Sequence, residues 1–461
     1  MLITVSNNLQ IEDVSPEFEE WCKKNLVLIN PEYTKKERMG FWVGNTPKFI
    51  HLFEKRGNTY ALPYGSMSMF PQTIRQQSYY FDNIGKRETV EYNAEIPLYD
   101  YQREAVNEMY SYGYGILQSP AGSGKTQMGI ALAVKHKCKT LWIAHTKDLV
   151  QQSKERAEQY IDKSLIGTIT EGKVNIGKGI TFATIQTMAK LDISQIKDYW
   201  DCIIVDEAHR VSGTPTSVTQ YMKVLNNLSA HHKYGLSATV HRADGMIQAT
   251  YALLGRVMYN VPDEAVNGRI MQVGIKTIFT GTENSRECMN SDGTLNYTKL
   301  INYLADNEVR NELIAKIIGY ENRPSLVLSD RLGHLENIYN HLPKELQKQS
   351  VMISGKMNTK KGKIQREQVL SQMRSGEKKI LFATYSLAKE GLDIPRLERL
   401  YLTTPQKDYA VVTQSIGRIA RISEGKAEPV AYDFVDDIPY CKRAYSKRRG
   451  IYRKNRCYEV N

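Results

Sequence analysis

Long hydrophobic runs are absent from this chain of 461 residues. No apolar stretch approaches the roughly 18 residues that a membrane-spanning helix needs, and residues 1–10 lack the basic flank of a secretory signal. Cysteine is also scarce, because the chain has only six, which are scattered and form neither a close pair nor a metal-type cluster with histidine. These absences exclude membrane-spanning and disulfide-stabilised secreted proteins, argue against a structural zinc site, and predict a soluble, unsecreted protein with reduced thiols.

Short repeats and low-complexity tracts are absent as well. Hydrophobic residues make up 41% of the chain and charged residues 24%, which is close to the average for globular proteins and enough to bury a core in several domains. The composition therefore excludes a disordered, collagen-like or fibrous protein. At about 100 to 200 residues per domain, a chain of this length is expected to form roughly two or three domains.

Basic residues outnumber acidic residues by 62 to 50, which gives a formal net charge of +12. The excess is concentrated near the C-terminus, where residues 442–456 include eight basic and no acidic side chains. A basic balance of this kind favours a polyanionic partner such as nucleic acid. The segment is either a contact for phosphates or a solvated C-terminal helix, and the sequence leaves both interpretations open.

The hydrophobic pattern divides the chain. Residues 1–95 have short alternating runs between turn signals, which predict a small strand-rich accessory domain. Residues 96–262 and 263–440 each alternate short apolar runs with amphipathic ones, the order that builds a parallel sheet covered by helices, and residues 441–461 form a basic tail. We therefore predict two tandem α/β lobes after the N-terminal domain. The expected strands are 115–118, 140–144, 180–183 and 202–205 in the first lobe, and 325–328, 351–353, 379–383, 399–402 and 429–434 in the second.

A glycine-rich segment follows the first of these strands and opens a helix. Its glycines allow backbone N–H groups to approach phosphates, and the N-terminus of the helix adds a favourable field. The lysine would reach the β- and γ-phosphates of ATP, and the threonine after it would bind Mg²⁺. The alternative is an ordinary glycine turn before a helix. The predicted ATP-binding residues are Pro120, Ala121, Gly122, Ser123, Gly124, Lys125 and Thr126.

Two adjacent carboxylates end the apolar strand at 202–205. At the carboxyl edge of a parallel sheet and beside a phosphate loop, Asp206 can hold Mg²⁺ together with Thr126, and Glu207 can orient or deprotonate the attacking water. Two buried acids in sequence are costly unless a cation compensates them. The alternative is a solvated Asp-Glu pair at an ordinary strand end.

Residues 206–209, Asp-Glu-Ala-His, resemble the motif that names the DEAH-box group of superfamily 2 helicases. Other segments resemble the remaining motifs of this family, in the same order, from about residue 97 to residue 436. Gln102 resembles the glutamine that reads adenine, and residues 236–239 (Leu-Ser-Ala-Thr) resemble the motif that couples hydrolysis to movement. The segments around 145 and 185 resemble motifs that contact the nucleic-acid backbone, which implies such a role for His145, Thr146, Thr184 and Gln186.

The second lobe completes the resemblance. Residues 384–395 are similar to the motif in which Thr384 would meet the strand backbone and Gly391 and Asp393 would approach the nucleotide. Residues 414–421 resemble the motif that brings Gln414 to the nucleotide and supplies arginine charges to the γ-phosphate. The resemblance implies that Arg421 is the arginine finger, with Arg418 adjacent. It also implies two RecA-like lobes that close on ATP and Mg²⁺.

Within the superfamily, residues 235–245 resemble the Arg-x-Asp segment of the UvsW and XPB type of DNA helicase and of related phage enzymes. Arg242 would then contact nucleic acid, although Arg242 and Asp244 can also form a simple capping pair. Ala243 occupies a position that is glutamate in XPB, so a role of that acid in strand separation does not carry over. The helix at 307–314 is likewise similar to the one that opens the second lobe in this branch.

The predicted function is an ATP-dependent DNA helicase or translocase that acts on single-stranded, forked or branched DNA in the cytoplasm, the host cytoplasm if a phage encodes it. The alternatives are an RNA helicase, the motor subunit of a larger restriction or repair complex, and a non-catalytic DNA-binding scaffold. The N-terminal aromatic residues either stack on bases or fill a small β core. Basic residues nearby could instead clamp duplex DNA through its phosphates. These aromatic residues are Phe41, Trp42, Phe49, Phe53, Tyr60 and Tyr64, and the basic ones are Lys35, Lys36, Arg38, Lys55 and Arg56.

Overall fold

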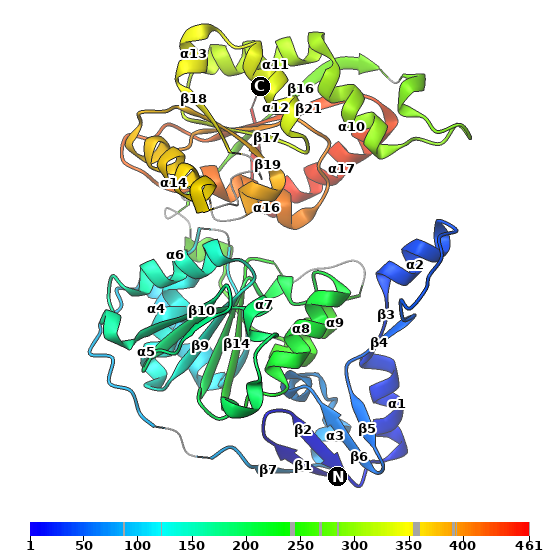
Figure 1. The fold of residues 1–461 in the computed structure, drawn as a ribbon, viewed down its shortest axis with the longest axis vertical. Coiled ribbons are helices and arrows are strands. Elements are labelled where there is room, and N and C mark those ends of the chain that lie inside the picture. The colour runs from blue at the N-terminus through cyan, green and yellow to red at the C-terminus, as the bar shows by residue number, and fades with distance from the viewer. Residues whose placement is uncertain are drawn as a thin grey trace. The chain divides into compact units, whose positions relative to one another are not determined.

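A computed structural model of the chain describes residues 1–85, 88–120, 122–239, 245–266, 270–283, 285–353, 360–389, 392 and 394–460. The chain divides into two compact units, one of Met1–Pro120 with Gly124–Ala265 and one of Val266–Asn461 with Ala121–Ser123. Figure 1 labels the elements of each unit. Within the described ranges, no helix is both long enough and apolar enough to cross a membrane.

The first unit begins with a five-stranded sheet in the order β5-β6-β2-β1-β7. Alternate side chains of its strands, including Ile3, Val5, Leu9 and Ile11, are buried against helix α1, which starts after the N-cap Ser15. This alternation is typical of a sheet with one buried face. The elements are β1 (Leu2–Val5), β2 (Leu9–Glu12), α1 (Pro16–Asn25), β5 (Glu54–Arg56), β6 (Thr59–Leu62) and β7 (Tyr79–Asp82).

The N-terminal sheet packs directly on the first α/β lobe. The 3-10 helix η1 (Tyr64–Met69) lies against α9 (Ile247–Leu254), and the core of the N-terminal sheet continues into the lobe through Val218 and Met246. Gly65 has no room for a Cβ because the backbone of Gly255 already occupies that space. The hydrophobic core of the N-terminal sheet therefore extends onto α9 of the lobe, through Ala249 and Ala252.

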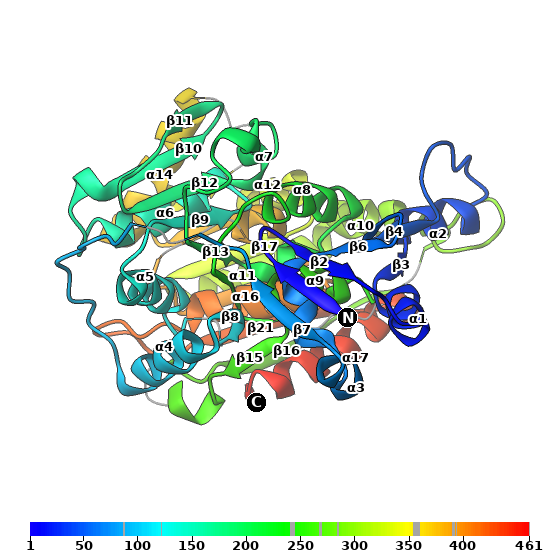
Figure 2. The same cartoon turned by 90° about the horizontal axis from the view of Figure 1, so that it is seen from below.

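The sheet of the first lobe has the strand order β11-β10-β12-β9-β13-β14-β8-β15, parallel except for the pair of β11 and β10. Figure 2 shows α4, α5 and α6 on one face and α7, α8 and α9 on the other. The strands are β8 (Tyr114–Gln118), β9 (Thr140–Ala144), β10 (Ile166–Thr170), β11 (Lys173–Asn175), β12 (Ile180–Thr184), β13 (Cys202–Asp206), β14 (His232–Ser237) and β15 (Val257–Asn260). The helices are α4 (Asp100–Tyr112), α5 (Lys125–His136), α6 (Lys147–Ala157), α7 (Ile185–Met188), α8 (Pro215–Leu225) and α9.

The second unit is built on a parallel sheet in the order β18-β19-β17-β20-β21-β16-β22. Two parallel-sheet lobes after a strand-rich N-terminal sheet confirm the predicted fold class. The strands are β16 (Gly274–Glu283), β17 (Ser325–Ser329), β18 (Ser350–Ile353), β19 (Ile380–Thr384), β20 (Arg399–Leu402), β21 (Val430–Asp437) and β22 (Tyr458–Glu459). The helices are α10 (Tyr297–Asp306), α11 (Glu308–Glu321), α12 (Leu332–Asn340), α13 (Lys344–Lys348), α14 (Lys360–Ser375), α15 (Tyr385–Lys389), α16 (Tyr409–Ile419) and α17 (Pro439–Lys454).

The basic C-terminal segment forms α17, which packs against β21. Most of its charged side chains face solvent, but Arg448 is only 1% exposed. The segment is therefore a helix of the second lobe with one buried cation, and not a uniformly solvated one.

Candidate nucleotide and nucleic-acid sites

The phosphate loop connects the end of β8 to the start of α5. Gly122 and Gly124 have φ of 84° and 80°, a backbone conformation that other residues rarely adopt. A Cβ on Gly124 would also lie 2.5 Å from Nε2 of Gln102. Lys125 lies at the N-terminus of α5, where its Nζ donates to the carbonyl oxygens of Ser119 (3.4 Å) and Pro120 (3.3 Å). The local geometry is thus a turn whose N–H groups and lysine suit an anion, while Ala121 lies outside the described residues.

Gln102, the candidate adenine-reading residue, lies on α4 beside this loop. Its side chain is 4% exposed, and its Oε1 accepts a hydrogen bond from the backbone N–H of Tyr99 at 3.0 Å. Its Nε2 faces Gly124, as the short distance above shows. The structure therefore brings Gln102 and the phosphate loop together although 22 positions separate them in the sequence.

The two carboxylates lie where β13 ends, next to β14 and β9 in the sheet. Asp206 is 5% exposed and accepts hydrogen bonds from Ser153 Oγ (3.3 Å) and from the backbone N–H of Glu207 (2.9 Å). Burial, followed by the charge of Glu207, raises the pKa of Asp206, and the charge of Lys125 opposes that rise. A divalent cation would remove this cost, because Mg²⁺ takes carboxylate and hydroxyl oxygens as ligands.

Glu207 has a different electrostatic balance. Burial alone would raise its pKa, but the hydrogen bond and charge of His209 and the charges of Lys125 and Arg210 outweigh burial and lower it. The backbone of Glu207 has φ of 50°, an uncommon value for a residue with a side chain. Such outliers persist when the surrounding structure fixes them, often at functional sites. Glu207 is therefore held as a carboxylate in a fixed direction at the strand end.

A short polar chain links these acids to the segment after β14. His209 Nδ1 lies 3.2 Å from Glu207 Oε2 and 3.2 Å from Ser237 Oγ. Ser237 Oγ donates to the carbonyl oxygen of Thr239 at 2.6 Å and accepts from its N–H at 3.2 Å. The Asp-Glu-Ala-His segment and the Ser-Ala-Thr segment therefore touch through His209. The next predicted contact, Arg242, lies outside the described residues.

Four candidate nucleic-acid contacts lie at or just after the ends of two adjacent strands, since β9 and β12 pair with Ala144 opposite Thr184. Gln186 Nε2 donates to the carbonyl oxygen of His145 at 2.9 Å, which joins the two segments. Thr146 caps α6 by accepting from Leu149 N–H. Burial, with the charges of Arg210 and His209, lowers the pKa of His145, whose buried Nδ1 has no hydrogen-bond partner among the described residues. The four residues thus form one cluster at the carboxyl edge of the sheet.

In the second lobe, Thr384 ends β19, while Gly391 and Asp393 lie outside the described residues. Gln414 and Arg418 lie one turn apart on α16, and Arg418 Nη1 donates to the carbonyl oxygen of Leu392 at 3.0 Å. Oε1 of Gln414 is buried and lacks a hydrogen-bond partner within the described part of the chain. A buried acceptor of this kind suits a ligand that donates hydrogen bonds.

Arg421 follows the end of α16, and Lys426 holds its backbone. The Nζ of Lys426 donates to the carbonyl oxygens of Ile419 (2.8 Å), Arg421 (2.6 Å) and Pro395 (2.9 Å). Burial lowers the pKa of Lys426 to about 8. Sequence reasoning missed this lysine, because its acceptors lie on separate segments that only folding brings together.

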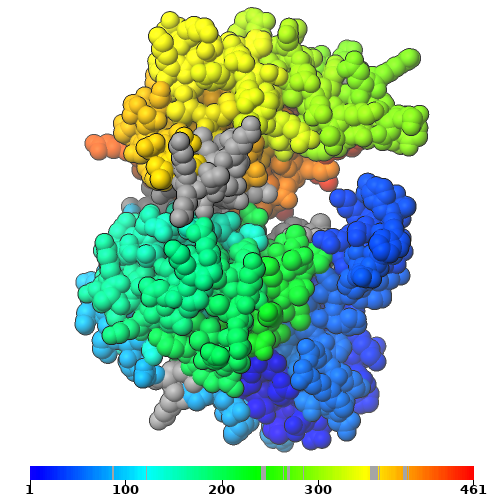
Figure 3. Space-filling view, viewed as in Figure 1, coloured from blue at the N-terminus to red at the C-terminus, as the bar shows by residue number. Residues whose placement is uncertain are grey.

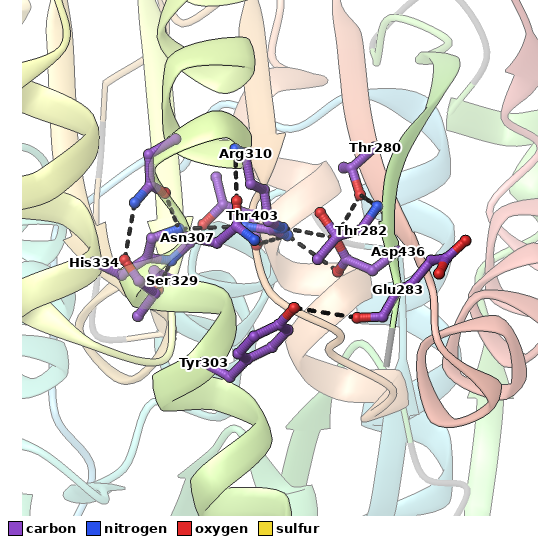
Figure 4. Close-up of polar contacts among 12 residues, drawn as sticks. Thr280, Thr282, Glu283, Tyr303, Asn307, Arg310, Ser329, His334, Thr403 and Asp436 are labelled. Carbon is purple, nitrogen blue, oxygen red and sulfur yellow. Dashed lines mark hydrogen bonds and ion pairs between the residues drawn. The ribbon is translucent and has the colours of Figure 1, made fainter. Parts of the chain in front are cut away.

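Two buried arginines, which sequence reasoning also missed, hold the loop between β20 and α16. Arg310 Nη2 donates to the carbonyl oxygen of Thr403 (2.6 Å), and Arg448 Nη1 donates to that of Gln406 (2.7 Å). Each arginine pairs with a buried carboxylate of β21, Arg310 with Asp436 and Arg448 with Asp433. Figure 4 shows Arg310 between Asp436 and Thr403. The pairs anchor the loop from which α16, with Gln414 and Arg418, begins.

Comparison with known proteins agrees with this geometry. The family model described as "Type III restriction enzyme, res subunit" matches residues 95–242, and the model described as "Helicase conserved C-terminal domain" matches residues 309–423. A DNA 3'-5' translocase named XPB2 from Sulfurisphaera tokodaii is 26% identical over 72% of this chain and 79% of that protein. The ATP-dependent DNA helicase uvsW of Enterobacteria phage T4 is 23% identical over 80% of this chain and 74% of that protein.

The chain belongs to the UvsW and XPB type of superfamily 2 helicases. It is therefore an ATP-dependent helicase that uses a nucleotide. Another relative of this helicase, from Acanthamoeba polyphaga mimivirus, is provisionally named an ATP-dependent RNA helicase and is 26% identical over 87% of this chain and 80% of that protein. A solved structure of S. cerevisiae Dbp5 bound to RNA and ADP BeF3 shares the fold, with a TM-score of 0.52 and 16% identity over 79% of this chain and 94% of that one.

Proposed function

We propose that this helicase is a DNA translocase that uses ATP and Mg²⁺ to move along DNA and to unwind or remodel forked or branched DNA. The observation that carries the proposal is the contact chain from the acid pair through His209 to Ser237 and Thr239, at the same sheet edge as the phosphate loop and the His145 cluster. A change at the acids can pass along this edge to residues placed to touch a strand. The names of the XPB2 and uvsW relatives support DNA as the nucleic acid.

In this proposal, Lys125 and the backbone of the phosphate loop bind the phosphates, while Gln102 contacts the base. Thr126 and Asp206 hold Mg²⁺, which, when bound, neutralises charge on the phosphate oxygens. Glu207, kept ionised by His209, orients the water that attacks the γ-phosphate.

The second lobe completes the reaction when it closes on the first. Arg421 and Arg418 then stabilise charge that develops on the transferred phosphoryl group, and Gln414 contacts the nucleotide. Because this stabilisation exists only in the closed arrangement, hydrolysis is coupled to movement of the lobes and hence to a step along the strand. Thr384, with the His145 cluster and Arg242, would hold the phosphate backbone, so binding should weaken steeply with salt and depend little on sequence.

The test is ATP hydrolysis by the purified full chain with single-stranded DNA, forked DNA, a four-way junction and an RNA homopolymer. We expect the DNA substrates to stimulate hydrolysis, and the forked or branched ones to be unwound. Stimulation of ATP hydrolysis by RNA but not by DNA would favour the RNA-helicase alternative, which the name of the mimivirus relative supports. Absence of any hydrolysis would favour a scaffold.

The arginine finger has its own test. Arg421→Ala should lower the stimulated hydrolysis rate by about 10³ to 10⁵, whereas Arg286→Ala, at an exposed arginine of the same lobe, should not change it. An Arg421→Ala protein with full DNA-stimulated activity would contradict the assignment.

A stable partner recovered with the tagged chain would instead support a motor subunit of a larger restriction or repair complex. We propose the cytoplasm as its place of action, because relatives of the chain come from phages.

A further inference from the structure

A projecting arm of the N-terminal region has a surface that the proposed function does not yet use. The arm consists of residues 27–51, with β3 (Val27–Ile29), α2 (Pro31–Arg38) and β4 (Phe49–His51). Figure 1 shows it extending away from the five-stranded sheet, and Figure 3 shows it standing out from the first unit. Helix α2 buries none of its residues. The arm therefore contributes little to the hydrophobic core.

Large apolar side chains are exposed along this arm, where burial would be expected. The indole of Trp42 is 87% exposed, and Phe41 is 61% exposed. Exposed apolar clusters of this kind mark interaction sites in soluble proteins. The other members are Ile29 (63%), Met39 (53%) and Phe49 (44%).

The arm is nevertheless an ordered scaffold. Asn30 is 1% exposed and joins its two ends, since its Nδ2 donates to the carbonyl oxygen of Pro47 (2.8 Å) and its Oδ1 accepts from Glu32 N–H (2.9 Å). Lys36 Nζ donates to Thr46 Oγ1 at 2.7 Å across the loop. These hydrogen bonds hold the loop that carries Phe41 and Trp42.

The ring of Trp42 lies beside a glycine. A Cβ on Gly44 would lie 2.8 Å from the indole ring, so only glycine allows the ring to lie this close to the backbone. The six-membered ring of the indole thus lies beside the backbone at Gly44, while 87% of the residue remains accessible. A flat and accessible ring is what base stacking requires.

Basic side chains accompany the rings. Lys35, Arg38 and Lys48 are exposed, and Lys48 Nζ lies 5.9 Å from the ring centroid of Phe49. The arm also has two exposed acids on α2, Glu32 and Glu37, so it is not simply a cationic patch. Rings for bases together with cations for phosphates form the combination by which proteins bind single strands.

We propose that the arm contacts unpaired bases of DNA, with Trp42 and Phe41 stacking on bases and the neighbouring cations contacting phosphates. This proposal rests on the proposed function and adds a substrate preference to it. Paired bases in a duplex are already stacked on one another, so the rings would reach unpaired bases in preference to paired ones. The arm therefore favours forks and single strands over blunt duplex.

Tryptophan fluorescence gives a direct measurement. The chain has four tryptophans; Trp142 and Trp200 are 0% and 1% exposed, and Trp21 packs against the N-terminal core. Titration of the full chain with forked DNA should quench the emission of Trp42, and Trp42→Phe should remove that quenching. Trp42→Ala should weaken binding to the fork by roughly 5- to 150-fold, as expected for loss of a stacked base. Tyr320→Ala, at an 89% exposed tyrosine of α11, should bind like the wild type.

The outcomes separate the arm from the proposed function. The proposal for the arm is supported if Trp42→Ala loses affinity for forked DNA while its thermal melting and its affinity for blunt duplex stay unchanged. If Trp42→Ala loses affinity for blunt duplex as much as for the fork, base stacking by the arm is overturned. It is also overturned if the wild-type protein binds the fork but its tryptophan fluorescence is not quenched. If no DNA stimulates ATP hydrolysis by the wild type, the proposed function fails. In that case, quenching of Trp42 fluorescence by single-stranded DNA would still support contact between the arm and unpaired bases.

Discussion

The substitution Asp436→Asn tests how much the buried pair of Arg310 and Asp436 stabilises the second lobe. The side chains of Arg310 and Asp436 are 0% and 1% exposed, and Arg310 contacts both oxygens, with Nε to Oδ1 at 2.6 Å and Nη2 to Oδ2 at 3.2 Å. The amide keeps the size of the carboxylate but removes its charge, so the guanidinium remains buried without compensation. Breaking one partner of such a pair costs about 3 to 5 kcal/mol.

The loss should appear in the thermal unfolding of the second lobe. At about 2 to 4 °C per kcal/mol for a unit of this size, the melting temperature should fall by roughly 6 to 20 °C. Differential scanning calorimetry of the full chain measures this fall. Lys316→Met is the matched control, because it breaks an exposed i, i+4 pair with Glu312 on α11, and such a pair contributes only about 0.3 to 0.5 kcal/mol.

A double variant gives a further check. Arg310→Met with Asp436→Leu removes both charges, and apolar replacement of a whole buried pair is often neutral or better, so it should be more stable than Asp436→Asn alone. The carboxylate also accepts from Thr280 Oγ1 at 2.7 Å, so recovery should be incomplete. A melting temperature of Asp436→Asn within about 2 °C of the wild type, well below the fall expected for a broken buried pair, would refute the expectation that the loss of this charge destabilises the second lobe.

Two further predictions concern acid stability and the phosphate loop. Burial and the charge of Arg310 hold the pKa of His334 well below its usual value of 6.5. Below about pH 6.5 the unfolded chain therefore binds a proton at this residue that the folded chain does not. The free energy of unfolding should then decrease as pH falls, by up to about 1.4 kcal/mol per pH unit from this residue. Urea unfolding between about pH 5 and 7, the range around the unfolded pKa of histidine, should show a shallower decrease in His334→Gln, and an unchanged slope would contradict the assignment. Gly124→Ala should abolish binding of a fluorescent ATP analogue because its Cβ would meet Gln102, whereas Gly172→Ala, also at positive φ but with nothing within 4 Å, should bind normally at a strain cost of about 1 kcal/mol. Equal binding by the two glycine variants would show that the contact with Gln102 is unimportant.

The strands that the sequence predicted well are those buried on both faces. The ranges 140–144 and 399–402 coincide with β9 and β20, because a central parallel strand is a continuous apolar run with abrupt ends. The strands β14 and β16 were not predicted, since polar residues interrupt them. Lys233 in β14 is 0% exposed and is accommodated because its Nζ donates to the carbonyl oxygens of Asn7 and Leu225.

The N-terminal aromatic residues show what local sequence does not distinguish. Tyr60 and Tyr64 are 3% and 7% exposed and belong to the core, whereas Trp42 is 87% exposed on the arm. Both kinds occur in short alternating runs of similar composition. Whether a ring is buried depends on where the sheet ends and on what packs against it, which are properties of the whole unit.

Chemistry carried by consecutive residues follows from the amino-acid sequence alone. The phosphate loop with Lys125, the acids at 206 and 207, and their placement at strand ends follow from the residues and from the rule that parallel strands end at one edge. The partners of Arg448 and Lys426 depended on folding, because each is chosen by contacts among separate segments. Eight basic side chains near the C-terminus look alike in the sequence, and only the packing of α17 on β21 determines that Arg448 is the one that meets Asp433.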